Sequence, residues 1–169
     1  LNGGNLRFDA VQSITIDNNV LLTGDFSTSS GNDFVINGNV ALHEAAYSAG
    51  ATRIWNLGGS GTMGVYGVVS GANGSNLIKN SAQFLVLGGT NTYQGYTQIN
   101  QGEIIAQGNV LPNVAGAFGI SDSPIVLGSG AANVAGGIGI GGKFTIGRDI
   151  ILGQATGTGS SALDARTNE

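Results

Sequence analysis

Apolar residues in this chain come in short groups separated by polar and glycine-rich stretches. Three groups alternate apolar and polar side chains, which is typical of a strand with one buried face, at residues 13–17, 97–100 and 143–146. Others are unbroken apolar runs, typical of strands buried on both faces, at 34–36, 84–87, 104–106, 125–127 and 150–152. The pattern predicts an all-β chain of many short strands.

Glycine and asparagine mark the corners between these strands. Asn18-Asn19 follows the first alternating group, and Gly88-Gly89 follows the run at 84–87. Both residue types adopt positive φ or tight bends at low steric cost. Residues 41–49 differ, because they are rich in alanine and end before Gly50. Nine residues are too few for a stable isolated helix, so we expect a helical turn on a loop or a strand of small residues.

Many short strands fit either a sandwich or a β-solenoid, and three features favour the solenoid. Charged residues make up only 9% of the chain, which is sparse for the exterior of a sandwich. Small residues and asparagine recur at corners, where like residues can stack between coils. Residues 14–16 and 20–22 also resemble 144–146 and 150–152, at an offset of 130 residues. This weak repeat fits a segment cut from a longer array.

The composition fits one ordered domain of 169 residues. Hydrophobic residues make up 41% and the net charge is −4, whereas disordered chains combine low hydrophobicity with high net charge. The six basic residues are scattered, so no basic stripe for nucleic acid is present. No run of 18 apolar residues predicts a membrane-spanning helix. The absence of cysteine excludes cysteine nucleophiles, zinc–cysteine sites and iron–sulfur clusters.

A motif in the middle of the chain is more specific. The stretch LGGTNTYQGYTQINQGEI, residues 87–104, resembles the autotransporter-associated β-strand repeat, whose pattern is roughly L-x-G-x-N-T-Y-x-G-x-T-x-[VI]-x-x-G-x-[LI]. The matching positions are Gly89, Asn91, Thr92, Tyr93, Gly95, Thr97, Ile99, Gly102 and Ile104. The resemblance is clearest over 53–106. It departs from the family after Lys79, where a glycine is usual and this chain has Asn80-Ser81-Ala82-Gln83.

The resemblance implies a right-handed parallel β-helix over residues 1–169, of the kind found in autotransporter passengers and other large secreted surface proteins. It implies a bacterial cell-surface or extracellular location, and it carries no catalytic signature and no cofactor. Because the chain begins at Leu1, we expect a piece or a processed form of something longer. Residues 107–120 are the expected excursion from the coil.

Elementary physics gives the motif residues separate tasks. In a parallel coil, backbone groups bond to the levels above and below, about 4.8 Å away. Asn91 is placed to cap backbone groups at a corner, while Thr92 and Thr97 suit strand edges. Tyr93 is expected to pack its ring on the next coil, with its hydroxyl in water. Four residues should face inward as apolar ladders: Leu85, Leu87, Ile99 and Ile104.

Catalytic residues are not expected. His43 is the only histidine, and on a strand its neighbour Glu44 would point to the opposite face, so the two would not act as an acid–base pair. No G-x-S-x-G elbow accompanies His43. A glycosidase needs two carboxylates a few ångströms apart, and stacking could bring together distant acids such as Asp9 and Asp33. The acids are Asp9, Asp17, Asp25, Asp33, Glu44, Glu103, Asp122, Asp149, Asp164 and Glu169.

Binding sites for small ligands are weakly indicated at most. The glycine runs at 58–61 and 136–139 begin a calcium-binding β-roll signature but lack its aspartate, which leaves only Asp17 or Asp33 near asparagine-rich turns. No metal is therefore expected. Residues 139–142 have the composition of a nucleotide-binding glycine loop but no helix after them. Three aromatic residues could instead form a platform for sugars: Trp55, Tyr66 and Tyr96.

We therefore expect a non-catalytic structural segment that acts as a stalk, spacer or filament. Coils of about 20 residues would give about eight levels, and exposed strand edges would pair with further repeats or with a second subunit. The alternative is an adhesin module that binds glycans or a protein of a partner cell. A carbohydrate-active enzyme is a third reading, which would require clustered carboxylates.

Overall fold

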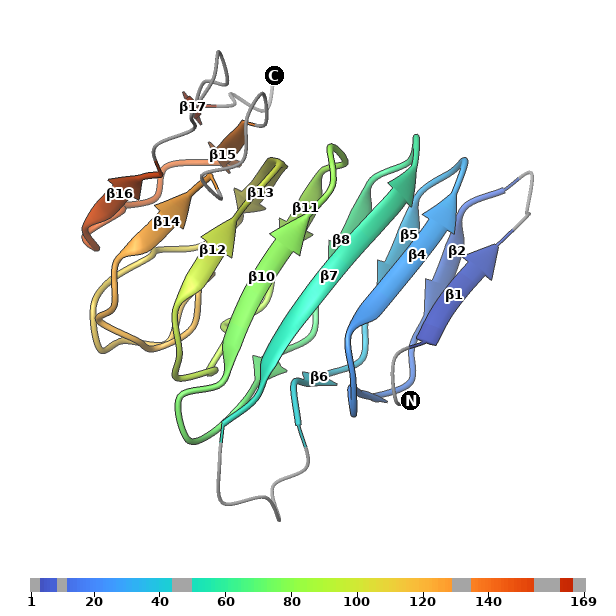
Figure 1. Cartoon of the computed structure of the whole chain (residues 1–169), viewed down its shortest axis with the longest axis horizontal. Helices are drawn as coiled ribbons and strands as arrows, with labels where there is room; N and C mark the ends of the chain where they lie inside the picture. Colours follow the sequence, from blue (N-terminus) through green and yellow to red (C-terminus); the bar gives the residue numbers. More distant parts are fainter. Residues whose placement is uncertain (1–3, 9–11, 44–49, 129–134, 154–161, 166–169) are drawn as a thin grey trace.

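The computed structural model describes residues 4–8, 12–43, 50–128, 135–153 and 162–165. In these residues the chain forms seventeen strands and no helix. All pairs between the named strands are parallel, and they build sheets of seven, seven and three strands. The two larger sheets lie one behind the other, with the two termini at opposite ends of the row of strands (Figure 1).

Sheet A is the front sheet of Figure 1. In spatial order its strands are β1 (Gly4–Phe8), β4 (Phe26–Ser30), β7 (Thr52–Gly59), β10 (Asn76–Asn80), β12 (Thr97–Ile99), β14 (Ile125–Leu127) and β16 (Ile150–Leu152).

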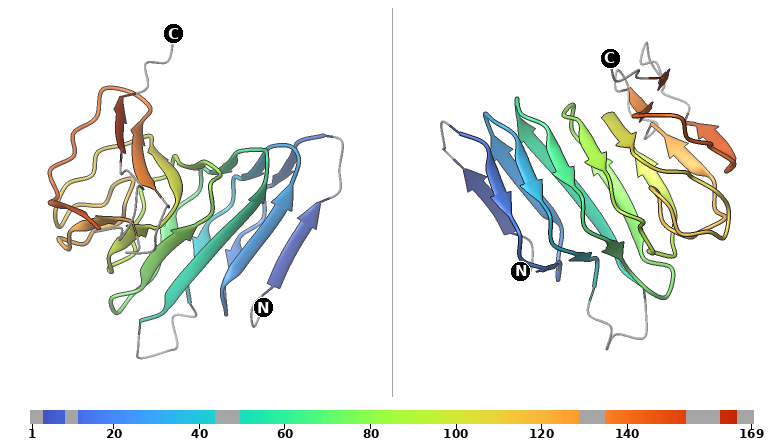
Figure 2. Two further views of the ribbon diagram at one scale, coloured as in Figure 1. Left: turned by 45° about the horizontal axis from the view of Figure 1, so that its top comes forward. Right: turned by 180° about the vertical axis from the view of Figure 1, so that it is seen from behind.

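Sheet B lies behind it and is seen from its own side in the right-hand view of Figure 2. Its strands are β2 (Ile14–Ile16), β5 (Phe34–Ile36), β8 (Met63–Val65), β11 (Leu85–Leu87), β13 (Gly102–Ala106), β15 (Gly136–Ile140) and β17 (Ala162–Ala165). The small sheet C holds β3 (Val20–Leu21), β6 (Val40–Ala41) and β9 (Val69–Ser70).

The chain visits the sheets in turn, and each strand pairs with the corresponding strand of the next pass. In sheet A the register offset is shortest between Leu77 and Thr97 and longest between Phe26 and Trp55, which are 20 and 29 residues apart. Several passes are thus longer than the expected 20 residues, and the larger sheets have seven strands each in place of about eight levels. The arrangement is compatible with the predicted parallel β-helix.

The core lies between the sheets. The four predicted inward residues are fully buried, which confirms the ladder expectation: Leu85, Leu87, Ile99 and Ile104. In sheet A one inward column contains Phe26, Trp55 and Ile99, and the rings of Phe26 and Trp55 meet edge to face at 5.9 Å. Two-sided burial of the apolar runs holds for β11 only, since β5 and β14 leave their middle residue half-exposed and β16 is largely exposed.

Two strand-level predictions fail. Residues 143–146 form no strand, because only Ile146 finds a partner, in a single bridge to Val110. The sequence repeat at an offset of 130 residues does not mark equivalent positions, since residues 14–16 lie in sheet B whereas 150–152 lie in sheet A. In the alanine-rich segment, Ala41 ends β6, and residues 44–49 lie outside the described part of the chain.

The connection between β13 and β14 is the longest that the structure describes in full. Residues 107–124 contain no named strand, and Figure 2 shows them in yellow and light orange beside β14. Val110 bridges to Ile146 in parallel, and Gly116 bridges to Asn91 in antiparallel orientation. Phe118 is fully buried. This connection therefore folds back and covers the central motif.

Candidate functional site

The central motif spans β11 to β13 through two corners. Gly89, Asn91 and Tyr93 lie in the corner before β12, which contains Thr97 and Ile99. The second corner leads into β13, where Gly102 and Ile104 lie. The motif thus supplies parts of both larger sheets and the corner that joins them.

Asn91 is fully buried and links three segments of the chain. Its side-chain Oδ1 accepts a hydrogen bond from the Val69 N–H at 2.7 Å, and its Nδ2 donates to the Ala117 carbonyl at 2.7 Å. Its backbone N–H donates to the Gly116 carbonyl at 2.9 Å, and its carbonyl accepts the Gly116 N–H at 3.2 Å. The predicted capping role of Asn91 is confirmed.

Tyr93 differs from its prediction. The side chain is fully buried, and its hydroxyl pairs with the Thr97 Oγ1 at 2.6 Å in place of water. Burial raises the pKa of Tyr93. The cause of the enclosure is the long connection, because the Ile120 N–H donates to the Tyr93 carbonyl at 3.0 Å and Gly119 lies against the ring. Thr97 is buried for the same reason, and so it does not lie at an exposed strand edge.

The remaining motif positions set backbone geometry. Gly102 has φ +68°, a left-handed conformation that favours glycine, and a Cβ there would lie 2.6 Å from the Ala82 carbonyl oxygen. At Gly95 a Cβ would lie 2.1 Å from the Asn76 Oδ1. Thr92 is exposed and contributes its backbone N–H to the Val69 carbonyl at 2.9 Å.

Three basic side chains turn inward and bind backbone carbonyls. Arg53 Nε donates to the carbonyls of Leu22 and Leu42, at 3.2 and 2.7 Å. Arg148 donates through Nη1 to the Phe118 carbonyl at 2.7 Å and through Nε and Nη2 to the Ser123 carbonyl, so it ties the long connection to the last levels. Burial lowers the pKa of the Arg148 guanidinium. These cations act as internal braces and are not presented to a ligand.

Lys79 is the third and most buried of these braces. Its Nζ donates to the carbonyl of Ser81 at 2.6 Å and to that of Gln101 at 2.8 Å, which lie in consecutive passes. Burial lowers the pKa of Lys79 to about 8, although Glu103 opposes the shift. Ser81 has φ +100°, so a serine occupies a conformation that favours glycine. This is the turn where the sequence departs from the family pattern.

His43 is buried and meets Ser75, a pair that resembles two members of a catalytic triad. Ser75 Oγ gives its proton to the Ala72 carbonyl at 2.7 Å and accepts the Ala51 N–H at 3.2 Å. The contact of 3.3 Å between Ser75 Oγ and His43 Nδ1 must therefore be donated by the histidine. Because the imidazole donates, it does not activate the hydroxyl as a nucleophile. Glu44 lies outside the described residues.

The carboxylates serve corners in place of a metal or a substrate. Asp25 and Asp33 each precede a strand and accept a backbone N–H from the next pass, those of Ile54 at 3.0 Å and Thr62 at 2.9 Å. Asp17 accepts from the Asn37 amide at 2.8 Å. No group of three histidine, cysteine or acidic residues that could hold a metal occurs among the described residues. Asp9 lies outside them, so its approach to Asp33 is not described.

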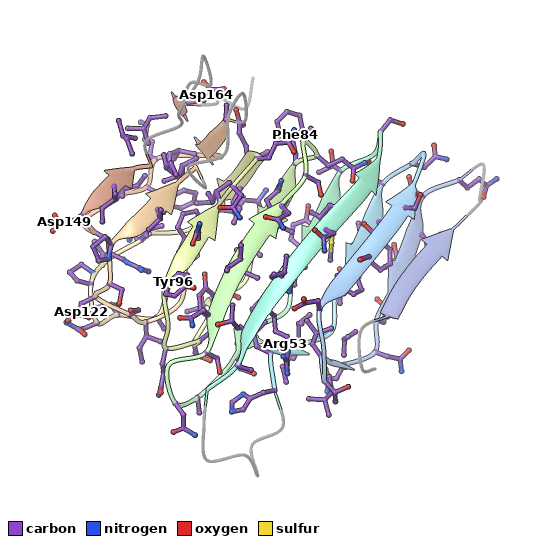
Figure 3. All side chains as sticks on the ribbon, in the orientation of Figure 1. Arg53, Phe84, Tyr96, Asp122, Asp149 and Asp164 are labelled. Atoms are coloured by element: carbon purple, nitrogen blue, oxygen red, sulfur yellow. The ribbon has the colours of Figure 1, made fainter. Side chains whose placement is uncertain are left out.

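The aromatic residues do not form one sugar platform. Trp55 is fully buried, Tyr96 precedes β12 of sheet A and Tyr66 follows β8 of sheet B. Figure 3 shows Tyr96 and Phe84 at opposite ends of the central strands. Tyr66 is the member of the predicted set with a largely exposed ring, at 47%. The glycine run at 139–142 completes β15 and the bend after it, and no helix follows.

Comparison with known proteins adds no relative. No family model matches the chain, and no curated protein or solved structure is significantly similar to it. The described residues contain no helix that is long and apolar enough to cross a membrane.

Proposed function

We propose that this chain is a non-catalytic structural segment, a stretch of right-handed parallel β-helix in an extracellular bacterial surface protein. It acts there as a stalk, spacer or filament, and its central motif fits the autotransporter-associated β-strand repeat. One observation carries the proposal, namely the parallel register that continues through seven strands in each larger sheet. Each added pass extends such a stack by about 4.8 Å.

The bonds between passes support a load-bearing role. Buried Asn91, Lys79 and Arg148 each join segments at least 22 residues apart through hydrogen bonds. A stack built this way must break several buried polar contacts to open at one level, and each buried group left unpaired costs about 1–3 kcal/mol. Because these cations are bound internally, they also leave few charges for nucleic acid.

The last described strands of the two larger sheets present apolar side chains to solvent. Leu152 in β16 is 61% exposed although it continues the inward column of Leu127, and Leu163 in β17 is 63% exposed. A further level would cover both side chains. We propose that it comes from further repeats or from a second copy stacked end to end.

The test is a tandem chain that carries two copies in succession, compared with a single copy. If the levels stack, electron micrographs and solution scattering will show one rod whose length doubles, with about 34 Å per seven-level copy. A matched tandem with Leu152→Lys and Leu163→Lys in the first copy should bend or separate at the junction. Two independent globular particles in the unmodified tandem would refute stacking, and turnover of a polysaccharide would favour the enzyme reading.

A further inference from the structure

Tyr66 lies across two glycines on the outer face of sheet B. A Cβ built at Gly64 would lie 2.9 Å from the Tyr66 Cε2, and one built at Gly88 would lie 2.5 Å from its Cδ1. These two ring atoms are on opposite sides of the ring, so the ring extends over both glycines and over two neighbouring strands. Any larger residue at either position would displace it. The glycines therefore seat the ring against the backbone and leave nearly half of the side chain in solvent.

Gln107 lies next to this ring in the same row. Tyr66, Gly88, Gln107 and Gly141 each follow a strand of sheet B at matching register positions. The Gln107 Oε1 lies 3.1 Å from the Cβ position of Gly88, so the amide approaches the same glycine as the ring. Gln107 is exposed, and its side chain makes no hydrogen bond within the described residues. An aromatic face and an unpaired amide are thus presented side by side.

The chemistry of this row suits a sugar. The apolar face of a pyranose stacks on an aromatic ring, and a neighbouring amide can both donate to and accept from its hydroxyls. Charge selects the class of sugar, because the chain has a net charge of −4 and Arg53, Lys79 and Arg148 are bound to internal carbonyls. An anionic polysaccharide would be repelled, whereas a neutral one would not.

We propose that Tyr66 and Gln107 form a binding site for a neutral glycan on the outer face of sheet B. Tyr66 stacks on a sugar ring, and Gln107 bonds to a hydroxyl of the same or the adjacent sugar. This site goes beyond the structural role, and it stands whether or not copies of the chain stack.

The test uses isothermal titration with neutral hexasaccharides of cellulose, mannan and chitin, and with oligogalacturonate as the anionic probe. The wild-type chain should bind at least one neutral probe with a Kd of about 0.1–10 mM. Tyr66→Ala should weaken this binding at least about tenfold and Gln107→Ala about threefold, whereas Tyr66→Trp should retain it. Tyr96→Ala on sheet A is the matched aromatic control and should bind like the wild type.

Several outcomes would overturn the site. These are no saturable binding of any neutral probe, tighter binding of oligogalacturonate, or neutral binding that Tyr66→Ala leaves intact. If Tyr66→Ala instead abolishes self-association of the chain without affecting sugars, the face is an interface between copies. Should Tyr66→Ala fail to fold, Gln107→Ala and Gly88→Ala decide, since Gly88→Ala displaces the ring and must weaken binding.

Discussion

Two asparagines that bracket β9 perform the same task in opposite surroundings. Asn39, in the preceding pass, accepts the Val68 N–H through its Oδ1 at 2.9 Å in an exposed corner. Asn91, in the following pass, accepts the adjacent Val69 N–H at 2.7 Å in the fully buried corner. Water can replace Asn39 as a partner, but it cannot reach the groups that Asn91 satisfies.

The difference extends to the regions around them. In the N-terminal passes, exposed side chains such as Asn19, Asp25 and Asp33 accept single backbone N–H groups from the next pass. In the central passes, the long connection covers the corner, and Asn91 bonds on both sides, to Val69 and to Ala117. Enclosure thus turns a replaceable corner cap into a junction of three segments.

The strongest test of this contrast is the isosteric pair Asn91→Asp and Asn39→Asp. Asn91→Asp removes the donor to the Ala117 carbonyl and buries a carboxylate, so we expect a loss of about 3–5 kcal/mol in the free energy of unfolding. Asn39→Asp should change it by less than about 0.5 kcal/mol, since Asp25 and Asp33 already cap corners in this way. Urea denaturation of both variants measures the difference, and equal losses would show that burial does not set the role.

The buried brace at Lys79 should give stability an unusual dependence on pH. The unfolded chain keeps the Lys79 proton up to its ordinary pKa of about 10.5, whereas the folded chain releases it near pH 8. The folded state therefore binds fewer protons between these values, and stability should rise by about 2–3 kcal/mol from pH 8 to pH 10. Above about pH 10 the raised pKa of Tyr93 opposes this rise, because the unfolded state then loses the tyrosine proton first.

Denaturation midpoints measured across this range check the linkage. Lys79→Met should abolish the rise, and the exposed Lys143→Met should leave it unchanged. A wild-type stability that falls steadily from pH 8 would contradict the assignment.

The hydroxyl of Tyr93 should matter far more than that of Tyr96. Tyr93→Phe leaves the buried Thr97 Oγ1 without its partner, and we expect a loss of about 1–2 kcal/mol. Tyr96 is half-exposed, so Tyr96→Phe should cost less than about 0.5 kcal/mol. Thermal unfolding of both variants, and of Tyr93→Phe with Thr97→Val, would show whether the loss comes from the shared hydrogen bond. If the double variant loses the sum of both single losses, the two groups do not couple.

The smallest expected effect is a gain. Ser81→Gly relieves a backbone held at φ +100° and should stabilise the chain by about 0.5–1 kcal/mol. The control is Asn73→Gly at φ +55°, where asparagine is already tolerated and no gain is expected. A loss on Ser81→Gly, measured by urea denaturation, would mean that the serine side chain contributes more than its backbone strain removes.

Apolar spacing located most of the central strands correctly, because their inward positions carry bulky residues. Strands with few such residues escaped it, as in β4, whose inward Thr28 and Ser30 are polar, and β15, which reads Gly-Gly-Ile-Gly-Ile. Residues 143–146 show the converse, since alternation alone predicted a strand where the register offers only one bridge. A strand exists only where a neighbouring pass supplies its hydrogen-bonding partners.

Local chemistry in the sequence was therefore sufficient for the all-β class, the inward ladders and the capping role of Asn91, because these depend on side-chain size and on hydrogen-bonding groups. Tertiary structure alone decided that Tyr93 is sealed from water, that Lys79 and Arg148 face inward, and that Trp55 is hidden while Tyr66 is exposed. The physical reason is that burial depends on what the rest of the chain places over a residue. Residues 107–124 cover the motif from a later pass, and no pattern within residues 87–104 encodes that cover.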